Sequence, residues 1–295
     1  MLKLQPVKMQ KNPFGYSRQL IVNLQAAFQK TDRKVINAAM ERKNKTGKLI
    51  VKKRETSGSG IRLNRFIASS GVCSRREADE LILKGLISVN GKVVKELGCR
   101  VGSNDVIKLR NRKLSPEKKV YILMNKPKDV VTTTSDPHAE KTVMDLIGDK
   151  AGVRLYPVGR LDKNTTGVLL LTNDGELAKK LTHPKYQRKK VYHVFLDRDV
   201  TRTDLEALVT GIDLEGERVA ADSAAYAAGE DKSQVGIEIH SGQNHVIKRM
   251  FESLGYKVKK LDRVYFAGLT KRNLPRGRWR YLTDKEISML KRGAF

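Results

Sequence analysis

The chain has 295 residues, with 59 Lys and Arg against 32 Asp and Glu and a formal net charge of +27. This length allows more than one domain and a sizeable hydrophobic core, and the excess of cations favours a polyanionic partner, nucleic acid first. No run of 18 apolar residues is present, so we expect a soluble protein that does not span a membrane.

The sequence offers little that could hold a metal or a cofactor. Its two cysteines, Cys73 and Cys99, can form neither a disulfide framework nor a cysteine zinc site, and we expect small buried hydrophobes in a reducing compartment, the cytoplasm. The five histidines form no pair at metal-ligand spacing, so no metal is predicted. Neither a P-loop motif nor a glycine-rich dinucleotide turn is present, which predicts no nucleotide cofactor.

Residues 1–60 differ in character from the rest of the chain. They contain 14 Lys or Arg and three acids, and they end in the Gly/Ser stretch ETSGSG. This composition predicts a basic arm, disordered or partly helical, that contacts RNA. An organelle transit segment is the alternative, because such segments also contain arginine and few acids.

A small folded module begins at Ile61. The stretch IRLNRFIA has helical apolar spacing, and a second helix is predicted from the capping box of Ser74 and Glu77 to Gly85. Next, ISVNGKVV predicts two short strands about an Asn-Gly turn, and NDVIKL predicts another strand. Residues 61–110 therefore predict a helix-helix-hairpin module of the α+β class.

Five cations lie between the apolar positions of the two helices: Arg62, Arg65, Arg75, Arg76 and Lys84. Burial of the apolar stripe turns several of them outward together, with few acids beside them. We predict that they contact RNA phosphates. A merely solvated charged face is the alternative.

After the linker NRKLSPEKK, residues 118–295 predict a larger domain. A strand VYILMNKP ends at Pro127, GVLLLT predicts a buried strand followed by an NDG turn, and KVYHVFL and QVGIEIH alternate as strands do. A helical face that includes Ile247 and Phe251 stops at Gly255, and TDKE is a capping box that begins a terminal helix. The pattern predicts an α+β domain with a mostly antiparallel sheet and flanking helices.

One carboxylate, Asp162, lies in the stretch GRLDKNTTG, just before the buried strand. An Asp beside a glycine turn is most often a cap or an acceptor for turn amides. Its position at the rim of a core strand favours a catalytic role instead, because burial and fixed neighbours can orient it. The candidate partners are Arg160, Tyr192 and Lys190 on a separate strand, and Lys248 at a helix start.

Two family resemblances follow from these motifs. A resemblance to the S4 RNA-binding domain is carried by RLNRFIASSGVCSRREADELILKGLISVNGK, and it implies structured RNA as ligand. A resemblance to the pseudouridine synthase family, of the RsuA/RluB/RluE/RluF type, is carried by VGRLDKNTTGVLLLTNDGELAKKLTHP, KVYHV and SGQNHVIKRMFESLGYKVKKLDRV. The stretch LPRGRW most resembles the branch that acts on large-subunit rRNA. Together they imply the pseudouridine synthase fold and site-specific isomerisation of uridine to pseudouridine in rRNA.

The resemblance also implies roles for individual residues. Asp162 would be the catalytic aspartate, acting as nucleophile or as base while the ribose–uracil bond is broken and the base rejoined through carbon five. Lys248 would keep this carboxylate ionised, and Tyr192 would lie against the target base and take the carbon-five proton. Arg160 would contact the flanking phosphate or fill the gap left by the flipped uridine. The other implied RNA contacts are Asn125, Lys126 and Arg249.

The implied partner is a structured stem-loop of rRNA, with no cofactor, and the absence of a coiled-coil seam predicts a monomer. The chain departs from the family pattern at two places. Val246 stands where many relatives carry glutamine, and the loop before it has SGQN where EGRN is frequent. Contacts that those polar groups make in relatives are therefore not carried over.

A non-catalytic RNA-binding ribosome-assembly factor is the main alternative, because the basic arm and the small module would bind RNA by themselves. Such a binder has no need of Asp162 together with Tyr192 and Lys248. A nuclease or a methyltransferase is disfavoured, since neither clustered metal ligands nor a glycine-rich cofactor loop is present.

Overall fold

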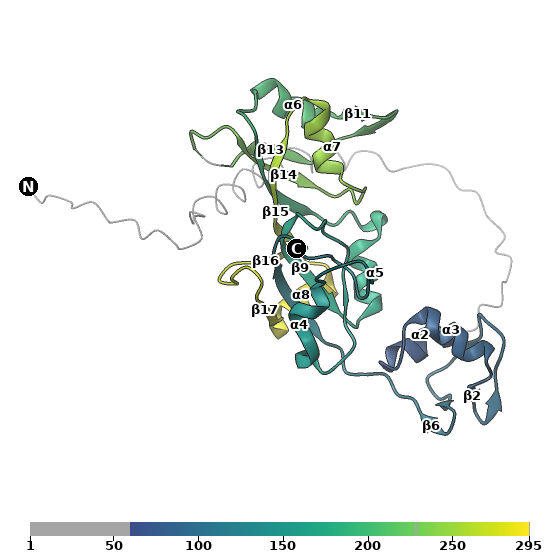
Figure 1. Cartoon of the computed structure of the whole chain (residues 1–295). Coiled ribbons are helices and arrows are strands. Elements are labelled where there is room, and N and C mark those ends of the chain that lie inside the picture. The colour runs from purple at the N-terminus through teal and green to yellow at the C-terminus, as the bar shows by residue number, and fades with distance from the viewer. Residues whose placement is uncertain (1–59, 228, 295) are drawn as a thin grey trace, which may run out of the picture. The chain divides into compact units, whose positions relative to one another are not determined.

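The structure is a computed structural model that describes residues 60–227 and 229–294 (Figure 1). The predictions for residues 1–59 lie outside the described residues. Within the described part the chain forms two compact units, which we treat separately. Unit 1 contains residues 164–166 and 184–270, and unit 2 contains residues 60–163, 167–183 and 271–294.

The first part of unit 2 is the small module predicted from the sequence. Its elements are β1 (Ile61–Arg62), α2 (Leu63–Ser69), α3 (Arg75–Leu83), β2 (Ile87–Val89), β3 (Lys92–Val93), β4 (Arg100–Val101), β5 (Ile107–Leu109) and β6 (Arg112–Lys113). The strands β3-β2-β5-β6 form one antiparallel sheet. The first helix begins two residues later than the sequence indicated, because Ile61 and Arg62 pair with β4.

Local sequence signals set the turns and helix ends of this module. The predicted capping box is confirmed, since the Ser74 hydroxyl accepts from the backbone N–H of Glu77 at 3.2 Å and the Glu77 carboxylate accepts from that of Ser74 at 2.5 Å. The predicted hairpin is confirmed too. Asn90 and Gly91 both have positive φ, 51° and 84°, as tight hairpin turns require.

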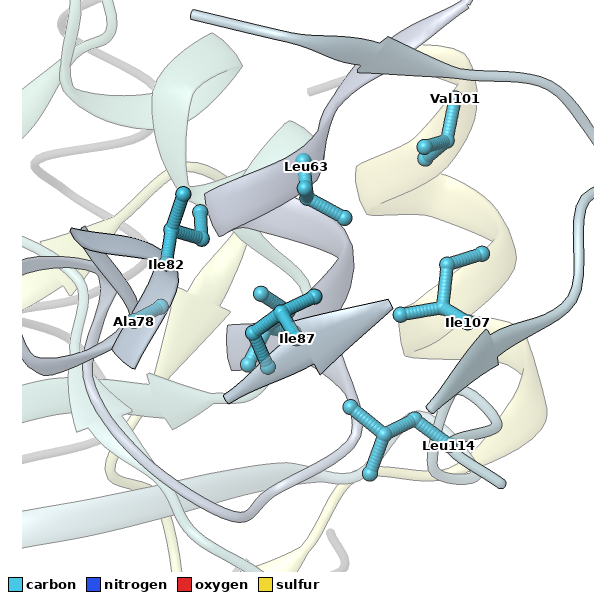
Figure 2. Close-up of a cluster of buried hydrophobic side chains, with 8 residues drawn as sticks. Leu63, Ala78, Ile82, Ile87, Val101, Ile107 and Leu114 are labelled. Carbon is cyan, nitrogen blue, oxygen red and sulfur yellow. The ribbon is translucent and has the colours of Figure 1, made fainter. Parts of the chain in front are cut away.

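The module has its own hydrophobic core, in which the two helices pack on the sheet (Figure 2). Each core side chain is at most 4% exposed. They are Leu63, Ile67, Ala78, Ile82, Ile87, Val101, Ile107 and Leu114. Because both helices and the strands contribute residues to this core, the module is one folded unit in which a layer of helices packs on a sheet.

The rest of unit 2 is built on three antiparallel strands in the order β9-β7-β17, and β8 also pairs with β9. Its elements are β7 (Tyr121–Lys126), α4 (Val143–Ile147), η1 (Gly148–Ala151), β8 (Tyr156–Pro157), β9 (Thr166–Thr172), α5 (Gly175–Thr182), β17 (Trp279–Tyr281) and α8 (Asp284–Arg292). The predicted buried strand is confirmed, because all seven residues of β9 are buried. The predicted NDG turn is instead the start of a helix: Asp174 caps α5 by accepting from two backbone N–H groups.

Unit 1 holds the antiparallel order β13-β14-β10-β15, with β16 paired to β15. Its elements are η2 (Pro184–Tyr186), β10 (Lys190–Leu196), α6 (Arg202–Thr210), β11 (Ile212–Leu214), β12 (Glu217–Val219), β13 (Ser223–Tyr226), β14 (Gln234–Ile239), α7 (Val246–Ser253), β15 (Val258–Phe266) and β16 (Leu269–Thr270). The predicted α+β class with a mostly antiparallel sheet is therefore confirmed. No helix in the described ranges is long and apolar enough to cross a membrane.

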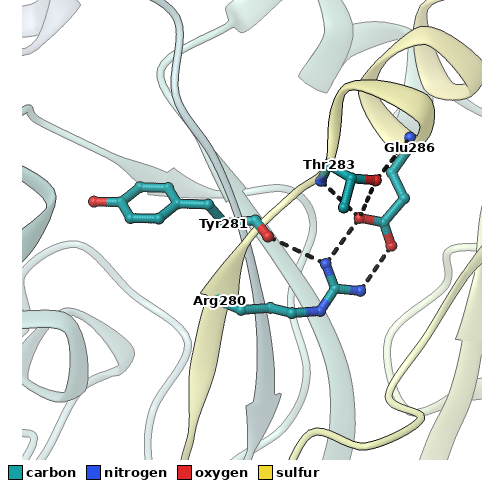
Figure 3. Close-up of polar contacts among 4 residues, drawn as sticks. All are labelled: Arg280, Tyr281, Thr283 and Glu286. Carbon is teal, nitrogen blue, oxygen red and sulfur yellow. Dashed lines mark hydrogen bonds and ion pairs between the residues drawn. The ribbon is translucent and has the colours of Figure 1, made fainter.

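The terminal helix α8 is fixed by a second predicted capping box (Figure 3). The Glu286 carboxylate accepts from the backbone N–H of Thr283 at 2.9 Å and from both Nη atoms of Arg280 at 2.8 and 2.7 Å. Arg280 also donates to the carbonyl of Tyr281 at 3.1 Å. Because Arg280 lies on β17, this carboxylate joins the helix to the sheet. The guanidinium and the cap hold the pKa of Glu286 below its usual value.

We predict that Glu286→Gln lowers the free energy of unfolding by about 1–2 kcal/mol at neutral pH, because charge-assisted hydrogen bonds are lost. A depressed folded-state pKa stabilises only above the unfolded-state pKa, so the difference from wild type should vanish as the pH falls through the folded-state pKa of Glu286. Urea unfolding over a pH series measures both effects. Asp284→Asn, in the same helix turn, serves as the control, and a pH-independent difference would contradict the assignment.

Candidate active site

The loop that carries Asp162 runs from Gly159 to Lys163, between β8 and β9 in unit 2. One buried hydroxyl fixes its middle: Thr132 donates to the carbonyl of Leu161 at 2.7 Å and accepts from the backbone N–H of Leu161 at 3.3 Å. Leu161 is itself buried, so the following residue is held at the surface of the core. The Asp162 side chain is half-buried there, and Arg160 is exposed.

A buried ammonium group lies beneath the same loop. Lys126 is 0% exposed, and its Nζ donates to the carbonyls of Pro127, Asp162 and Lys163 at 3.0, 3.1 and 3.1 Å. The backbone N–H of Asp129 also donates to the carbonyl of Lys163, at 3.0 Å. Burial lowers the pKa of Lys126 to about 8, and the carboxylates of Asp162 and Asp129 oppose this shift. The three donors of the amine thus meet three acceptors that belong to the loop and the strand end.

The side chains of Lys126 and Asn125 are both buried and bonded within the protein, and their contact with RNA stays a prediction. Asn125 donates from Nδ2 to the carbonyl of Leu274 at 2.8 Å, and its backbone exchanges hydrogen bonds with Arg278 and Gly277. Asn125 therefore connects the LPRGRW segment to β7 by hydrogen bonds, and Lys126 connects the Asp162 loop to the same strand. A lysine before a proline reads as exposed in sequence, and only tertiary packing reveals its burial.

In unit 1, Tyr192 lies on β10 and is 8% exposed. It faces Arg263 across the pair with β15, and the register of that pair shifts between Val191 and Tyr192. Such a bulge re-aims the side chains next to it. The neighbouring Lys190 donates from Nζ to the carbonyls of His240 and Ser241 at 2.9 and 2.8 Å, which anchors the SGQN loop to β10.

Burial lowers the pKa of Lys190 to about 8, helped by the positive charge of Arg263 and opposed by Asp222. The strand therefore places a half-buried cation and a buried tyrosine two residues apart. Nothing in the local sequence distinguishes this lysine from a solvated one, apart from the alternation that puts it on the same face as Tyr192.

The helix α7 carries the predicted Lys248 and Arg249 in its first turns, and both side chains are half-buried. Two acids of the β11–β12 hairpin hold this region. Arg249 donates from Nη2 to Glu215 at 3.0 Å, and Gln243 of the SGQN loop donates from Nε2 to Glu217 at 2.6 Å. We did not identify this hairpin from sequence, although the Glu-Gly pair between two short runs was its available signal.

Of the cations of the small module, Arg62, Arg75, Arg76 and Lys84 are exposed, as an RNA contact requires. Arg65 is half-buried and forms an ion pair with Glu176 of α5. A phosphate would have to compete with this carboxylate for Arg65. The contact of these residues with RNA stays a prediction.

Unit 2 brings Asp162, Lys126 and Arg160 to one loop, and unit 1 holds Tyr192 and Lys248. The meeting of Asp162 with Tyr192 and Lys248 stays a prediction. Among the residues that the structure covers, no group of three or more His, Cys, Asp and Glu side chains is placed to hold a metal ion. A single loop carboxylate over a buried amine suits acid-base or nucleophilic chemistry on a bound substrate.

Comparisons with known proteins identify the family of the chain. The RNA pseudouridylate synthase family model matches residues 120–253, and the S4 domain model matches residues 61–107. The ribosomal large subunit pseudouridine synthase B of Bacillus subtilis is 42% identical over 233 residues, which are 78% of this chain and 95% of that protein. The dual-specificity RNA pseudouridine synthase RluF of Escherichia coli is 34% identical over 78% of each chain.

A crystal structure of a pseudouridylate synthase is also similar, with 32% identity and a TM-score of 0.56 over 78% of this chain and 99% of that one. The chain is thus an RNA-modifying isomerase with an appended RNA-binding domain. It belongs to the RNA pseudouridine synthase family, which confirms the family, fold class and enzyme class predicted from the sequence.

We predict that Lys126→Met slows pseudouridine formation by about 100-fold, because small displacements of a reacting group have costs of that order. The three carbonyl contacts are lost while the methylene stem is largely kept, so RNA affinity should change by less than about two-fold. Single-turnover rates and filter binding on transcribed rRNA separate the two. Lys119→Met is the matched control, since Lys119 donates to the carbonyl of Asn173 at 3.3 Å away from the loop. Equal losses in both variants would contradict the assignment.

We also predict that Glu215→Gln tightens RNA binding by about two- to three-fold at low salt, because the exposed carboxylate competes with phosphate for Arg249. The gain should disappear at high salt. Glu206→Gln removes the same charge and an exposed ion pair with Arg202 on α6, and it should leave affinity unchanged. Weaker binding by Glu215→Gln would show instead that the pair positions α7.

Proposed function

We propose that this enzyme converts a specific uridine of large-subunit ribosomal RNA to pseudouridine, with Asp162 as the catalytic residue. The observation that carries the proposal is the Asp162 loop, which is built by the buried Lys126 and Thr132 around one half-buried carboxylate. The rRNA substrate is supported by the similarity to the Bacillus subtilis enzyme, whose name specifies the ribosomal large subunit. A protein that only binds RNA needs no such loop.

In the proposed reaction the uridine is flipped out of its helix, because the bond that breaks is inaccessible inside a stack. Asp162 then acts as nucleophile or as base while the N1–C1′ bond breaks, and the uracil rotates and bonds to C1′ through carbon five. Carbon five loses one proton to a base and N1 takes up one proton, so the isomerisation balances and no redox partner is needed. Arg160, exposed beside the loop, would contact the RNA backbone or occupy the vacated stack.

We assign Tyr192 and Lys248 to the same site. Tyr192 is largely buried beside a bulge, which suits an aromatic ring that packs against the flipped base and takes the carbon-five proton. Lys248, in the first turn of α7, would be the cationic partner of the Asp162 carboxylate. The SGQN loop reaches this region through Lys190, so its lack of the frequent EGRN residues does not leave it unanchored.

We further propose that residues 61–110 capture a structured stem-loop and that residues 118–295 form the catalytic domain, with the chain acting as a cytoplasmic monomer. Arg62, Arg75 and Arg76 are exposed on the small module and suit phosphate contact. The formal charge of +27 favours fast, salt-sensitive association with RNA.

We predict that Asp162→Ala lowers turnover by about 10⁴-fold or more, as removal of an essential group does, with nearly unchanged RNA affinity. Chemical mapping of pseudouridine across rRNA tests this in cells that lack the protein. One large-subunit site should vanish and return only with the wild-type gene. Asp199→Ala, at an exposed acid between β10 and α6, is the control and should restore the site. Rescue by Asp162→Ala would favour the assembly-factor alternative, and loss of no site would contradict the rRNA substrate.

A further inference from the structure

The two-residue turn between β5 and β6 in the small module is unusually rich in positive charge. Four cations lie within six residues, Lys108, Arg110, Arg112 and Lys113, and all are exposed. In the described part of the chain none of the four has an ion-pair partner. These four cations are different residues from the cations already described on α2 and α3. Figure 1 shows β6 away from α2.

Two features of this turn are energetically unfavourable. Lys108 and Lys113 lie directly opposite each other in the β5–β6 pair, where like charges destabilise. Arg110 has a φ of 54°, in the left-handed region that glycine or asparagine adopts more readily. Strain and repulsion kept at one exposed turn point to a ligand that uses these residues.

An apolar groove lies beside the turn. It has a volume of about 350 Å³ and is lined by Leu81, Leu86, Leu109, Arg110, Asn111 and Arg112. Leu81 and Leu109 continue the packed core of the module, so the groove is where the apolar face between α3 and the sheet reaches solvent. Its outer rim is formed by two arginines instead of another hydrophobic side chain.

We propose that this groove binds an unpaired nucleotide of a single-stranded RNA segment, with its base against the leucines and its phosphates on the cationic turn. Guanidinium planes stack on exposed bases and pair with phosphates, which suits Arg110 and Arg112 at the rim. The volume is at the lower end of the range for small-ligand sites, which fits one base rather than a helix or a protein segment. The acid-free turn disfavours a basic peptide.

This inference rests on the proposed function and adds to it a second RNA contact, made by residues other than the cations of α2 and α3. A uridine in a stem-loop flanked by a single strand would be held at both places. Binding of the single strand at the groove would then raise the effective concentration of the stem-loop at the Asp162 loop, without any new contact at that loop.

The test compares Arg110→Asn/Arg112→Gln with wild type in fluorescence anisotropy, using a single-stranded RNA of about 10 nucleotides and a duplex of equal length. Asparagine suits the positive φ, so the fold should be retained. We expect about a ten-fold loss for the single strand and a decrease of about 1.4 in the salt slope, for two phosphate contacts at about 0.7 each. Duplex binding should change by less than about two-fold.

Lys285→Gln/Arg292→Gln removes the same charge from exposed positions on α8 and is the matched control. It should bind both RNAs like wild type. If the turn variant and the α8 variant lost affinity equally for the single strand and for the duplex, the attraction would be nonspecific and the proposal would be overturned. A changed sedimentation coefficient in place of a changed RNA affinity would assign the groove to protein association instead.

A second variant tests the base contact. Leu86→Ser should lose the preference of the wild-type protein for the RNA over an abasic strand of the same length, with an unchanged salt slope. If wild type itself binds both strands equally, the groove takes no base. Pseudouridine formation by wild type on transcribed large-subunit rRNA is measured in parallel, so that failure of the proposed function is recognised independently.

Discussion

The conformation of the Asp162 loop depends on the buried ammonium group of Lys126. A charged amine removed from water costs several kcal/mol unless its donors are satisfied. Here all three donors find carbonyl oxygens, and two of these, from Asp162 and Lys163, belong to the loop. The loop must therefore keep its shape for the lysine to stay buried. Thr132 adds a second fixed point one residue earlier, so two buried side chains together hold the backbone that carries the carboxylate of Asp162.

The same device occurs in unit 1. Lys190 is half-buried at the start of β10, and it donates to carbonyls of the loop that precedes α7. Each unit thus holds one loop with a strand lysine whose pKa burial lowers to about 8. An ammonium group can reach several carbonyls at once from one flexible stem, which a neutral side chain of similar length cannot do. Main-chain acceptors also impose no requirement on the side chains of the loop, which stay available for substrate.

Features set by a few adjacent residues were predictable from the sequence. The capping boxes at Ser74 and Thr283, the Asn-Gly hairpin and the buried strand of GVLLLT have local causes, so they appeared as predicted. Features set by distant partners were not. The strand β1 forms because β4 lies beside it, and Asp174 reads equally as a turn residue or a helix cap. In the candidate site, the motif indicated Asp162, whose catalytic role stays a prediction, whereas the burial of Lys126 depends on a loop 36 residues away.

The burial of Lys126 also has a consequence for chemical reactivity. An amine with a lowered pKa is a good nucleophile, yet an acylating reagent cannot reach a side chain that is 0% exposed. Acylation of Lys126 therefore requires the Asp162 loop to detach from it. The slow fraction of lysine labelling would then report how often the Asp162 loop opens, in a protein whose many surface lysines react at once.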